Sequence, residues 1–128
     1  MAAILVVEDD AMMRQTLRAA LEDAGHAVAE APDGQRGLAL LCAAPAPLVV
    51  LLDHLMPLLD GEGVLERVAA GGEELRRHAY VLMTGAADHL SPRLAVLVGE
   101  LNVPVVAKPF SLDALLAAVA AAARRLGA

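Results

Sequence analysis

Four of the short apolar runs in this 128-residue chain are followed by, or end on, polar side chains whose types suit joint chemistry. These side chains are an acid pair, a third acid, a hydroxyl and an ammonium: Glu8, Asp9, Asp53, Thr84 and Lys108. Carboxylates about 4 Å apart repel by roughly 1 kcal/mol in water and about 4 kcal/mol at intermediate dielectric. A Mg²⁺ ion removes that repulsion, since it binds a few carboxylates together with water and a phosphate oxygen. The set therefore predicts a Mg²⁺-dependent site for a phosphoryl group.

Within this site, Asp53 is the predicted phosphoacceptor, because carboxylates act as covalent nucleophiles toward phosphate. Thr84 and Lys108 are predicted to bind the phosphoryl oxygens, Lys108 through its compact positive charge. Lys108 is the only lysine among ten basic residues, which makes its position stand out. Phosphoryl transfer depends mostly on positioning and charge neutralisation, and these residue types supply both.

Ordinary structural interpretations compete with the shared site. Glu8 and Asp9 could complement the dipole of a following helix, a role that we assign to Asp10 as well. Asp53 and Thr84 could be polar strand ends without any chemistry. Each alternative is reasonable for a single residue. The occurrence of all these polar residues at four strand ends favours a shared site.

The elements that must position these residues follow from hydrophobic patterning. Short apolar runs predict strands, and a continuous run such as residues 48–52 is typical of a strand buried on both faces. The runs occupy residues 3–7, 27–31, 48–52, 80–84 and 103–107. Helix-period patterns follow each run, near residues 13–24, 34–43, 64–68, 94–101 and 112–123. Strands alternating with helices imply a parallel sheet covered on both faces. We predict one α/β domain over residues 1–128, with five strands and five helices.

Several local features refine this prediction. The lone Cys42 excludes an internal disulfide and is expected to be buried beside Leu38 and Leu41 on the inner face of the second helix. Ser111 is the predicted N-cap of the last helix, and Asp60 a turn or cap residue. None of the four histidines is paired at ligand spacing. His54 is expected at the mouth of the cleft, and the other three, His26, His78 and His89, in loops or turns.

Composition narrows the class of partner. The formal charge of −6 argues against a nucleic-acid groove, which relies on clustered Lys and Arg. No apolar run approaches the roughly 18 to 20 residues that a membrane helix needs. The first residues, MAAILVVEDD, lack the basic region and cleavage site of a signal peptide. We expect a cytoplasmic protein that binds neither nucleic acid nor membrane.

Four stretches, "ILVVEDD", "LLDHLMPLLDG", "VLMTGAA" and "VVAKPF", resemble the receiver domain of two-component response regulators. They occur in that family's order and spacing, over nearly the whole chain, as in chemotaxis-regulator-like single-domain receivers. The resemblance implies a doubly wound, flavodoxin-like sheet with strand order 2-1-3-4-5. It also implies a cis bond between Lys108 and Pro109.

By matching position, the resemblance implies a Mg²⁺ site formed by Glu8, Asp9, Asp53 and the backbone carbonyl of Leu55. Asp9 would be the direct metal ligand of the acid pair. The same resemblance implies a signalling domain that takes a phosphoryl group onto Asp53. The donor would be the phosphohistidine of a histidine kinase, or a phosphotransfer protein, and the modified domain would change its binding to a downstream protein target.

The chain departs from the family pattern in two ways, at three positions. An aromatic residue often lies three positions before the lysine and moves inward when the threonine engages phosphate, but this chain has Val105. We therefore expect the signal to travel through the loop after Thr84 or through the fourth helix. The positions two residues after Asp53 and Thr84 often guide water, but here they are the apolar Leu55 and Ala86. This predicts slow hydrolysis of the phosphoryl group.

Three other functions remain open at this stage. One is a Mg²⁺-dependent phosphohydrolase of the haloacid dehalogenase type, but those enzymes place a second acid where this chain has Leu55. Another is a phosphate-independent binding module of the same fold, which Val105 keeps open. The third is a receiver domain excised from a hybrid histidine kinase. We expect no output domain and no turnover of a separate substrate, so the domain would catalyse only its own phosphorylation and hydrolysis.

Overall fold

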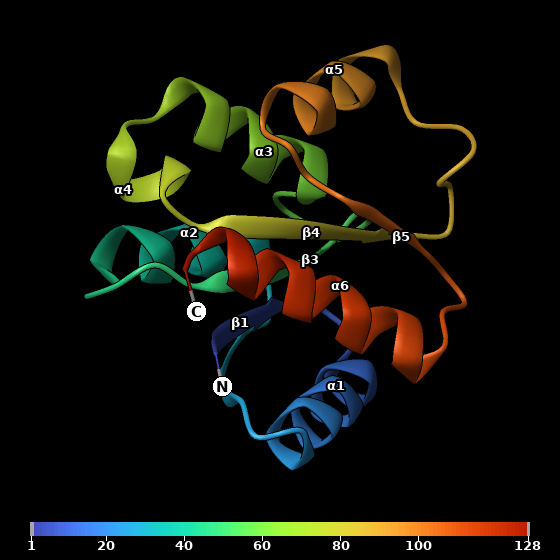
Figure 1. Cartoon of the computed structure of the whole chain (residues 1–128). Helices are drawn as coiled ribbons and strands as arrows, with labels where there is room; N and C mark the ends of the chain where they lie inside the picture. The colour runs from blue at the N-terminus through green and yellow to red at the C-terminus, as the bar shows by residue number, and fades with distance from the viewer. Residues whose placement is uncertain (1, 128) are drawn as a thin grey trace.

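Five parallel strands form the centre of the computed structural model, which describes residues 2–127 (Figure 1). They are β1 (Ala3–Val7), β2 (Ala27–Ala31), β3 (Val49–Asp53), β4 (Ala79–Thr84) and β5 (Val105–Ala107). The strand order is β2-β1-β3-β4-β5, so the predicted sheet and its order are confirmed. All residues of β3 and β4 are buried, as their continuous apolar sequences indicated. The predicted boundaries at Met1 and Ala128 lie outside the described residues.

Six helices are present among the described residues: α1 (Ala11–Asp23), α2 (Gly34–Ala43), α3 (Gly61–Ala70), α4 (Glu73–Arg76), α5 (Pro92–Glu100) and α6 (Leu112–Arg125). Five of them match the predicted helices, and α4 is additional. It spans only four residues after Gly72, so it is too short to produce a helical hydrophobic period. Within residues 2–127, no helix is long and apolar enough to cross a membrane.

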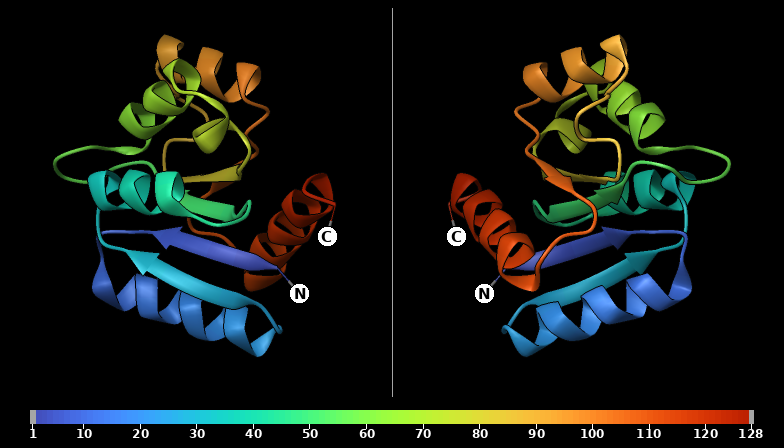
Figure 2. Two further views of the ribbon diagram at one scale, coloured as in Figure 1. Left: turned by 90° about the vertical axis from the view of Figure 1, so that its left-hand side faces the viewer. Right: turned by 90° about the vertical axis from the view of Figure 1, so that its right-hand side faces the viewer.

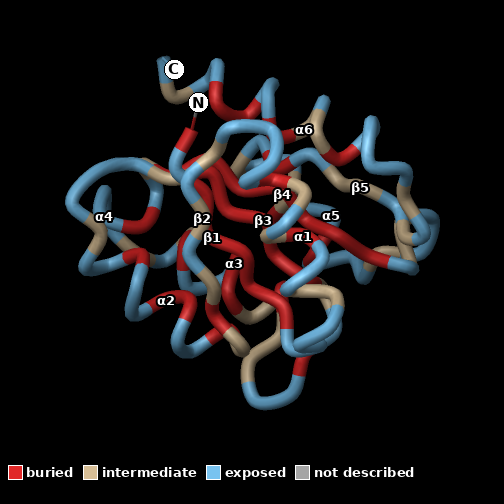
Figure 3. The backbone as a smooth tube through the Cα atoms, turned by 90° about the horizontal axis from the view of Figure 1, so that it is seen from below, coloured by how far each residue is buried: buried red, intermediate tan, exposed pale blue. Residues whose placement is uncertain are grey.

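The helices divide between the two faces of the sheet (Figure 2). Helices α1 and α6 cover one face, where Leu17, Leu21 and Leu115 pack on β1, β3 and β4. Helices α2, α3, α4 and α5 cover the other face, where Leu41 and Leu94 join a second apolar cluster. Figure 3 shows the buried backbone concentrated in the strands, with exposed segments around them. The sheet is therefore a rigid mount between two hydrophobic cores.

The expected caps are present at three helices. Asp10 accepts hydrogen bonds from the backbone N–H groups of Met12 and Met13 at the start of α1. Asp60 accepts one from Gly63 in α3, and Ser111 accepts one from Ala114 in α6. These side chains satisfy donors that a helix start leaves free. The bond between Lys108 and Pro109 is cis, as the resemblance implied.

The prediction for Cys42 is wrong, because this thiol is exposed. The buried stripe of α2 consists of Gly34, Gly37, Leu38 and Leu41. Cys42 follows Leu41 in the last turn of α2, outside the stripe of buried residues, and its side chain is exposed. Apolar spacing alone places a residue on a face of the helix but does not show how far along the helix that face is covered.

Candidate functional site

Three carboxylates meet at the carboxyl edge of the sheet. Asp53 is the last residue of β3, while Glu8 and Asp9 directly follow β1. One carboxylate oxygen from each lies within 4.8 Å of the others. Glu8 and Asp53 are buried, with 2% and 5% of their surface exposed, and Asp9 is exposed. The structure thus brings the predicted acids together, two of them buried and one exposed to solvent.

Lys108 provides the positive charge at this edge. Its Nζ lies 2.7 Å from Asp53 Oδ1 and 3.3 Å from Glu8 Oε1. Its backbone N–H donates to the carbonyl of Thr84, which fixes the chain after β5 against the end of β4. Burial alone would lower the pKa of Lys108, but the hydrogen bond and charge of Asp53 and the charge of Glu8 raise it above its usual value. The ammonium therefore remains charged and tied to the acids.

Glu8 has an unusual environment for a carboxyl group. Burial, together with the hydrogen bond and negative charge of Asp53, raises the pKa of Glu8 from 4.5 to about 7, although Lys108 opposes the shift. The charge of Lys108 thus does not offset the effects of burial and of Asp53 on Glu8. Hard oxygen ligands at such spacing are what Mg²⁺ binds in proteins. The oxygen donors and the spacing of Glu8, Asp9 and Asp53 fit this cation, and their role as its ligands stays a prediction.

Thr84 occupies the end of β4, next to the acids. Its side chain is buried, and its Oγ1 accepts a hydrogen bond of 3.0 Å from the backbone N–H of Ala86. The same oxygen lies 2.7 Å from Nδ1 of His54. The sequence placed His54 near the cleft but did not reveal this contact. The register of β3 and β4, which pairs Asp53 with Met83, brings residues 54 and 84 together.

The chain matches the family described as the response regulator receiver domain over residues 4–120. The chain belongs to this family. It is 38% identical over 122 residues to "Response regulator MprA" of Mycolicibacterium vanbaalenii, covering 95% of this chain and 50% of that protein. The receiver thus spans about half the length of the curated relatives that it matches.

Solved receiver structures share its fold. The chemotaxis protein CheY4 of Vibrio cholerae superposes with a TM-score of 0.76 at 26% identity, over 95% of this chain and 98% of the other. The signal receiver domain of a histidine kinase from Syntrophus aciditrophicus gives a TM-score of 0.79 at 25% identity, over 99% and 91% of the two chains. The comparisons agree with the flavodoxin-like topology of the sheet.

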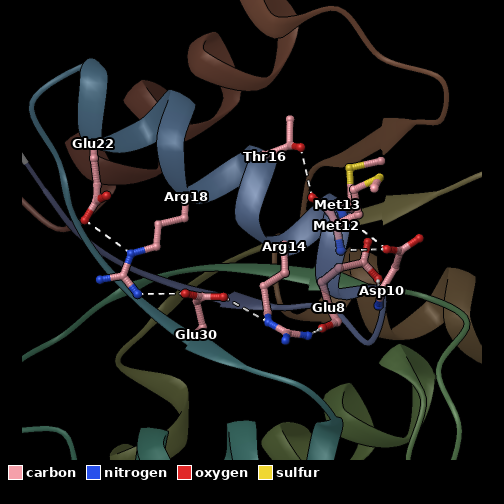
Figure 4. A network of polar contacts seen from close by, with 9 residues as sticks. All are labelled: Glu8, Asp10, Met12, Met13, Arg14, Thr16, Arg18, Glu22 and Glu30. Carbon is pink, nitrogen blue, oxygen red and sulfur yellow. Dashed lines mark hydrogen bonds and ion pairs between the residues drawn. The ribbon is translucent and has the colours of Figure 1, made fainter.

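A network of charged side chains supports the acid pair of the receiver from outside the site (Figure 4). Arg14 Nη1 donates to the backbone carbonyl of Glu8 at 2.7 Å, and its Nε donates to Glu30 at 2.9 Å. Arg18 binds the other oxygen of Glu30 at 2.7 Å. Helix α1 is thereby tied to β2 and to the segment carrying Glu8. The sequence analysis missed this support, for which the spacing of Arg14 and Arg18 by four residues was the available signal.

The two departures from the family pattern have clear positions in the receiver. Val105 starts β5, pairs with Leu82 and packs half-buried against the core. Leu55 is 69% exposed in the loop after β3, and Ala86 is half-buried beyond Thr84. None of these three side chains can hydrogen-bond. The role of the Leu55 carbonyl as a metal ligand stays a prediction.

Proposed function

We propose that the receiver is a phosphorylation-controlled signalling domain that accepts a phosphoryl group on Asp53. The observation that carries this proposal is the contact of 2.7 Å between Lys108 Nζ and Asp53 Oδ1 beside two further acids. A lysine fixed against the acceptor carboxylate is placed to pair with a phosphoryl group attached there. The donor is the phosphohistidine of a histidine kinase, or a phosphotransfer protein.

In the transfer, an Asp53 oxygen forms a bond to phosphorus while the bond from phosphorus to the donor histidine nitrogen breaks. When bound by Glu8, Asp9, Asp53 and the Leu55 carbonyl, Mg²⁺ supplies neutralisation of the charge on the phosphoryl oxygens. Lys108 pairs with one phosphoryl oxygen, and the Thr84 hydroxyl donates a hydrogen bond to another. The buried strand β3 holds the acceptor in a fixed position, which favours an in-line transfer.

The modified receiver then binds a protein target differently, and it turns over no separate substrate. Because Leu55 and Ala86 cannot orient an attacking water, the phosphoryl group hydrolyses slowly. A half-life of seconds for the phosphorylated protein at neutral pH would contradict this part of the proposal. We place the protein in the cytoplasm, where a kinase and a downstream protein partner would both be accessible.

Intact mass spectrometry after incubation with Mg²⁺ and acetyl phosphate tests the assignment. We expect one added phosphoryl group on the wild-type protein and none on Asp53→Asn or in the presence of a chelator. The Asn variant is a matched control, because it keeps the size of the side chain. An unmodified, folded wild type with both acetyl phosphate and a phosphorylated kinase would favour a phosphate-independent binding module, while turnover of added phosphomonoesters would favour a phosphohydrolase.

A further inference from the structure

The hydroxyl of Thr84 is already engaged before any phosphoryl group arrives. It accepts a hydrogen bond from the Ala86 N–H at 3.0 Å and lies 2.7 Å from His54 Nδ1. A threonine hydroxyl has a single proton to donate. The donor and acceptor roles in this contact depend on the tautomer of His54. In the tautomer protonated on Nε2, Nδ1 accepts the Thr84 proton, and Thr84 then has to release His54 before it can donate to another group.

No aromatic side chain is available at Val105 to follow a movement of Thr84. Val105 is a strand residue with an aliphatic side chain packed against the core. The side chain that does contact the Thr84 hydroxyl is His54, from the residue directly after the acceptor. A change at Thr84 therefore reaches the loop between β3 and α3 through this imidazole.

We propose that His54 is a positioning residue that holds the Thr84 hydroxyl in the unphosphorylated state and is released when Asp53 carries a phosphoryl group. This inference rests on the proposed function. The phosphoryl oxygens accept hydrogen bonds and compete with His54 Nδ1 for the one Thr84 proton. Hydrogen bonds to ionised acceptors are roughly twice as strong as neutral ones, so the phosphoryl group wins this competition.

The backbone around His54 is fixed, so the response is a rotation of its ring. The His54 N–H donates to the Met83 carbonyl at 3.0 Å, and the His54 carbonyl accepts from the Gly61 N–H at 2.7 Å. Gly61 packs so closely that a Cβ there would lie 2.6 Å from the Asp53 carbonyl oxygen. The half-buried imidazole, beside the exposed Leu55, then presents a different surface in the two states.

The first test follows the His54 ring nitrogens of the wild-type protein by ¹⁵N NMR at one fixed pH. Mg²⁺ and beryllofluoride are added, and ¹⁹F NMR shows whether this phosphoryl mimic binds Asp53. We expect the Nδ1 signal to move from a hydrogen-bonded acceptor to a water-exposed acceptor when the adduct forms. An adduct with an unchanged Nδ1 signal would overturn the inference alone. Failure to form any adduct would count against the proposed function and so remove the basis of the inference.

The second test compares His54→Phe with His89→Phe. Phenylalanine keeps the ring at position 54 but removes Nδ1, and His89 lies exposed in the loop after Thr84 as a matched control. In His54→Phe the unmodified state loses its neutral hydrogen bond between Thr84 and position 54, whereas the modified state loses nothing. Beryllofluoride should therefore bind this variant about 2- to 10-fold more tightly than it binds the wild type. His89→Phe should bind it as the wild type does. Unchanged or weaker binding by a folded His54→Phe protein would show that His54 does not hold Thr84 back. The wild-type NMR test decides the question if this variant fails to fold.

Discussion

The two ends of β4 carry polar groups that are arranged in opposite ways. At its amino end, His78 is buried and both ring nitrogens are bonded, Nδ1 to the Leu48 N–H at 2.9 Å and Nε2 to the Leu41 carbonyl at 3.1 Å. The neighbouring Tyr80 donates to the Leu75 carbonyl at 2.7 Å. At its carboxyl end, beside Thr84, three carboxylates lie together and one ammonium pairs with two of them, Glu8 and Asp53. At the amino end, His78 and Tyr80 are hydrogen-bonded to backbone groups, although the neighbouring Arg77 is charged and its buried Nε has no partner among residues 2–127. At the carboxyl end, the carboxylates outnumber the single ammonium.

This difference separates stability from function within one sheet. Paired neutral groups in a buried position hold elements together, and removing one partner leaves the other unsatisfied. Crowded acids reduce stability, and under the proposed function they form the site for a cation and a phosphoryl group. Substitutions at the two ends should therefore change the free energy of unfolding in opposite directions.

The largest effect is expected at the amino end. His78→Ala removes the partner of the Leu48 N–H and of the Leu41 carbonyl, so we expect a loss of about 2 to 4 kcal/mol in the free energy of unfolding. Urea denaturation at pH 7.5 measures it. His26→Ala is the control, because His26 is half-exposed and its side chain makes one hydrogen bond within residues 2–127, with the Ala2 N–H, so the cost should be below about 1 kcal/mol. Equal losses of unfolding free energy in His78→Ala and His26→Ala would contradict the special role of His78 in stability.

The opposite sign is expected for Glu8→Gln at the carboxyl end. The raised pKa of Glu8, about 7, means that the folded state disfavours its charge. This contribution to stability is complete below pH 4.5 and is lost as the pH rises through 7. Gln has no charge and keeps an acceptor for Lys108, so the variant should be more stable at pH 8 by about 1 to 3 kcal/mol. The gain should shrink at pH 5.5.

Urea denaturation without Mg²⁺ at both pH values measures this gain. Glu22→Gln is a matched control, since Glu22 lies exposed on α1 and its carboxylate is paired with Arg18. If Glu8→Gln is less stable than the wild type at pH 8, then the pair with Lys108 outweighs the crowding, and the carboxyl end is built for stability as well.

Most strands and helices could be predicted from the sequence pattern, because apolar runs define the strands and the right-handed crossover rule implies a parallel sheet covered on both faces. The strand order came from the resemblance to the receiver family and not from the pattern. The acids, Thr84 and Lys108 were found because parallel strands deliver their carboxyl ends to one edge. Helix α4 was missed because one helical turn has no hydrophobic period. The exposure of Cys42 depends on where the packed face of α2 ends, which the pattern does not contain.

The contacts of His54 and Arg14 were not predicted, for a different reason. They depend on the register between β3 and β4 and on the position of α1 over β2, and both are set by packing across distant parts of the chain. Once a strand order is assumed, the pairing of Asp53 with Met83 follows from aligning the two strand ends. The strand register would thus have been needed to predict which of the site residues contact one another.

A smaller effect is expected from Mg²⁺ itself. An ion that binds the folded carboxyl end should raise the free energy of unfolding by about 1 to 2 kcal/mol at roughly ten times its Kd. Titration of wild type with MgCl₂ against NaCl of equal ionic strength separates binding from screening. Asp9→Asn, at an exposed position, should change the stability without Mg²⁺ by less than about 0.5 kcal/mol yet remove most of the gain. A full gain in this variant would exclude Asp9 as a ligand.

The smallest effect concerns the pH dependence of the amino end. Burial, reinforced by the charge of Arg77, lowers the pKa of His78 below its ordinary value of 6.5. The unfolded chain then takes up this proton more readily, so stability is complete above pH 6.5 and declines as the pH falls below it. The contribution of Glu8 to stability has the opposite pH dependence in an overlapping pH range. The effect of His78 is therefore measured in the Glu8→Gln variant. Urea denaturation from pH 7.5 to 5.5 should show a decline in Glu8→Gln that is reduced in the double variant with His78→Gln. Equal slopes of the free energy of unfolding against pH in the two variants would mean that His78 binds a proton as readily in the folded chain as in the unfolded chain. The two ends of β4 would then differ in the crowding of charges but not in the cost of burying a charge.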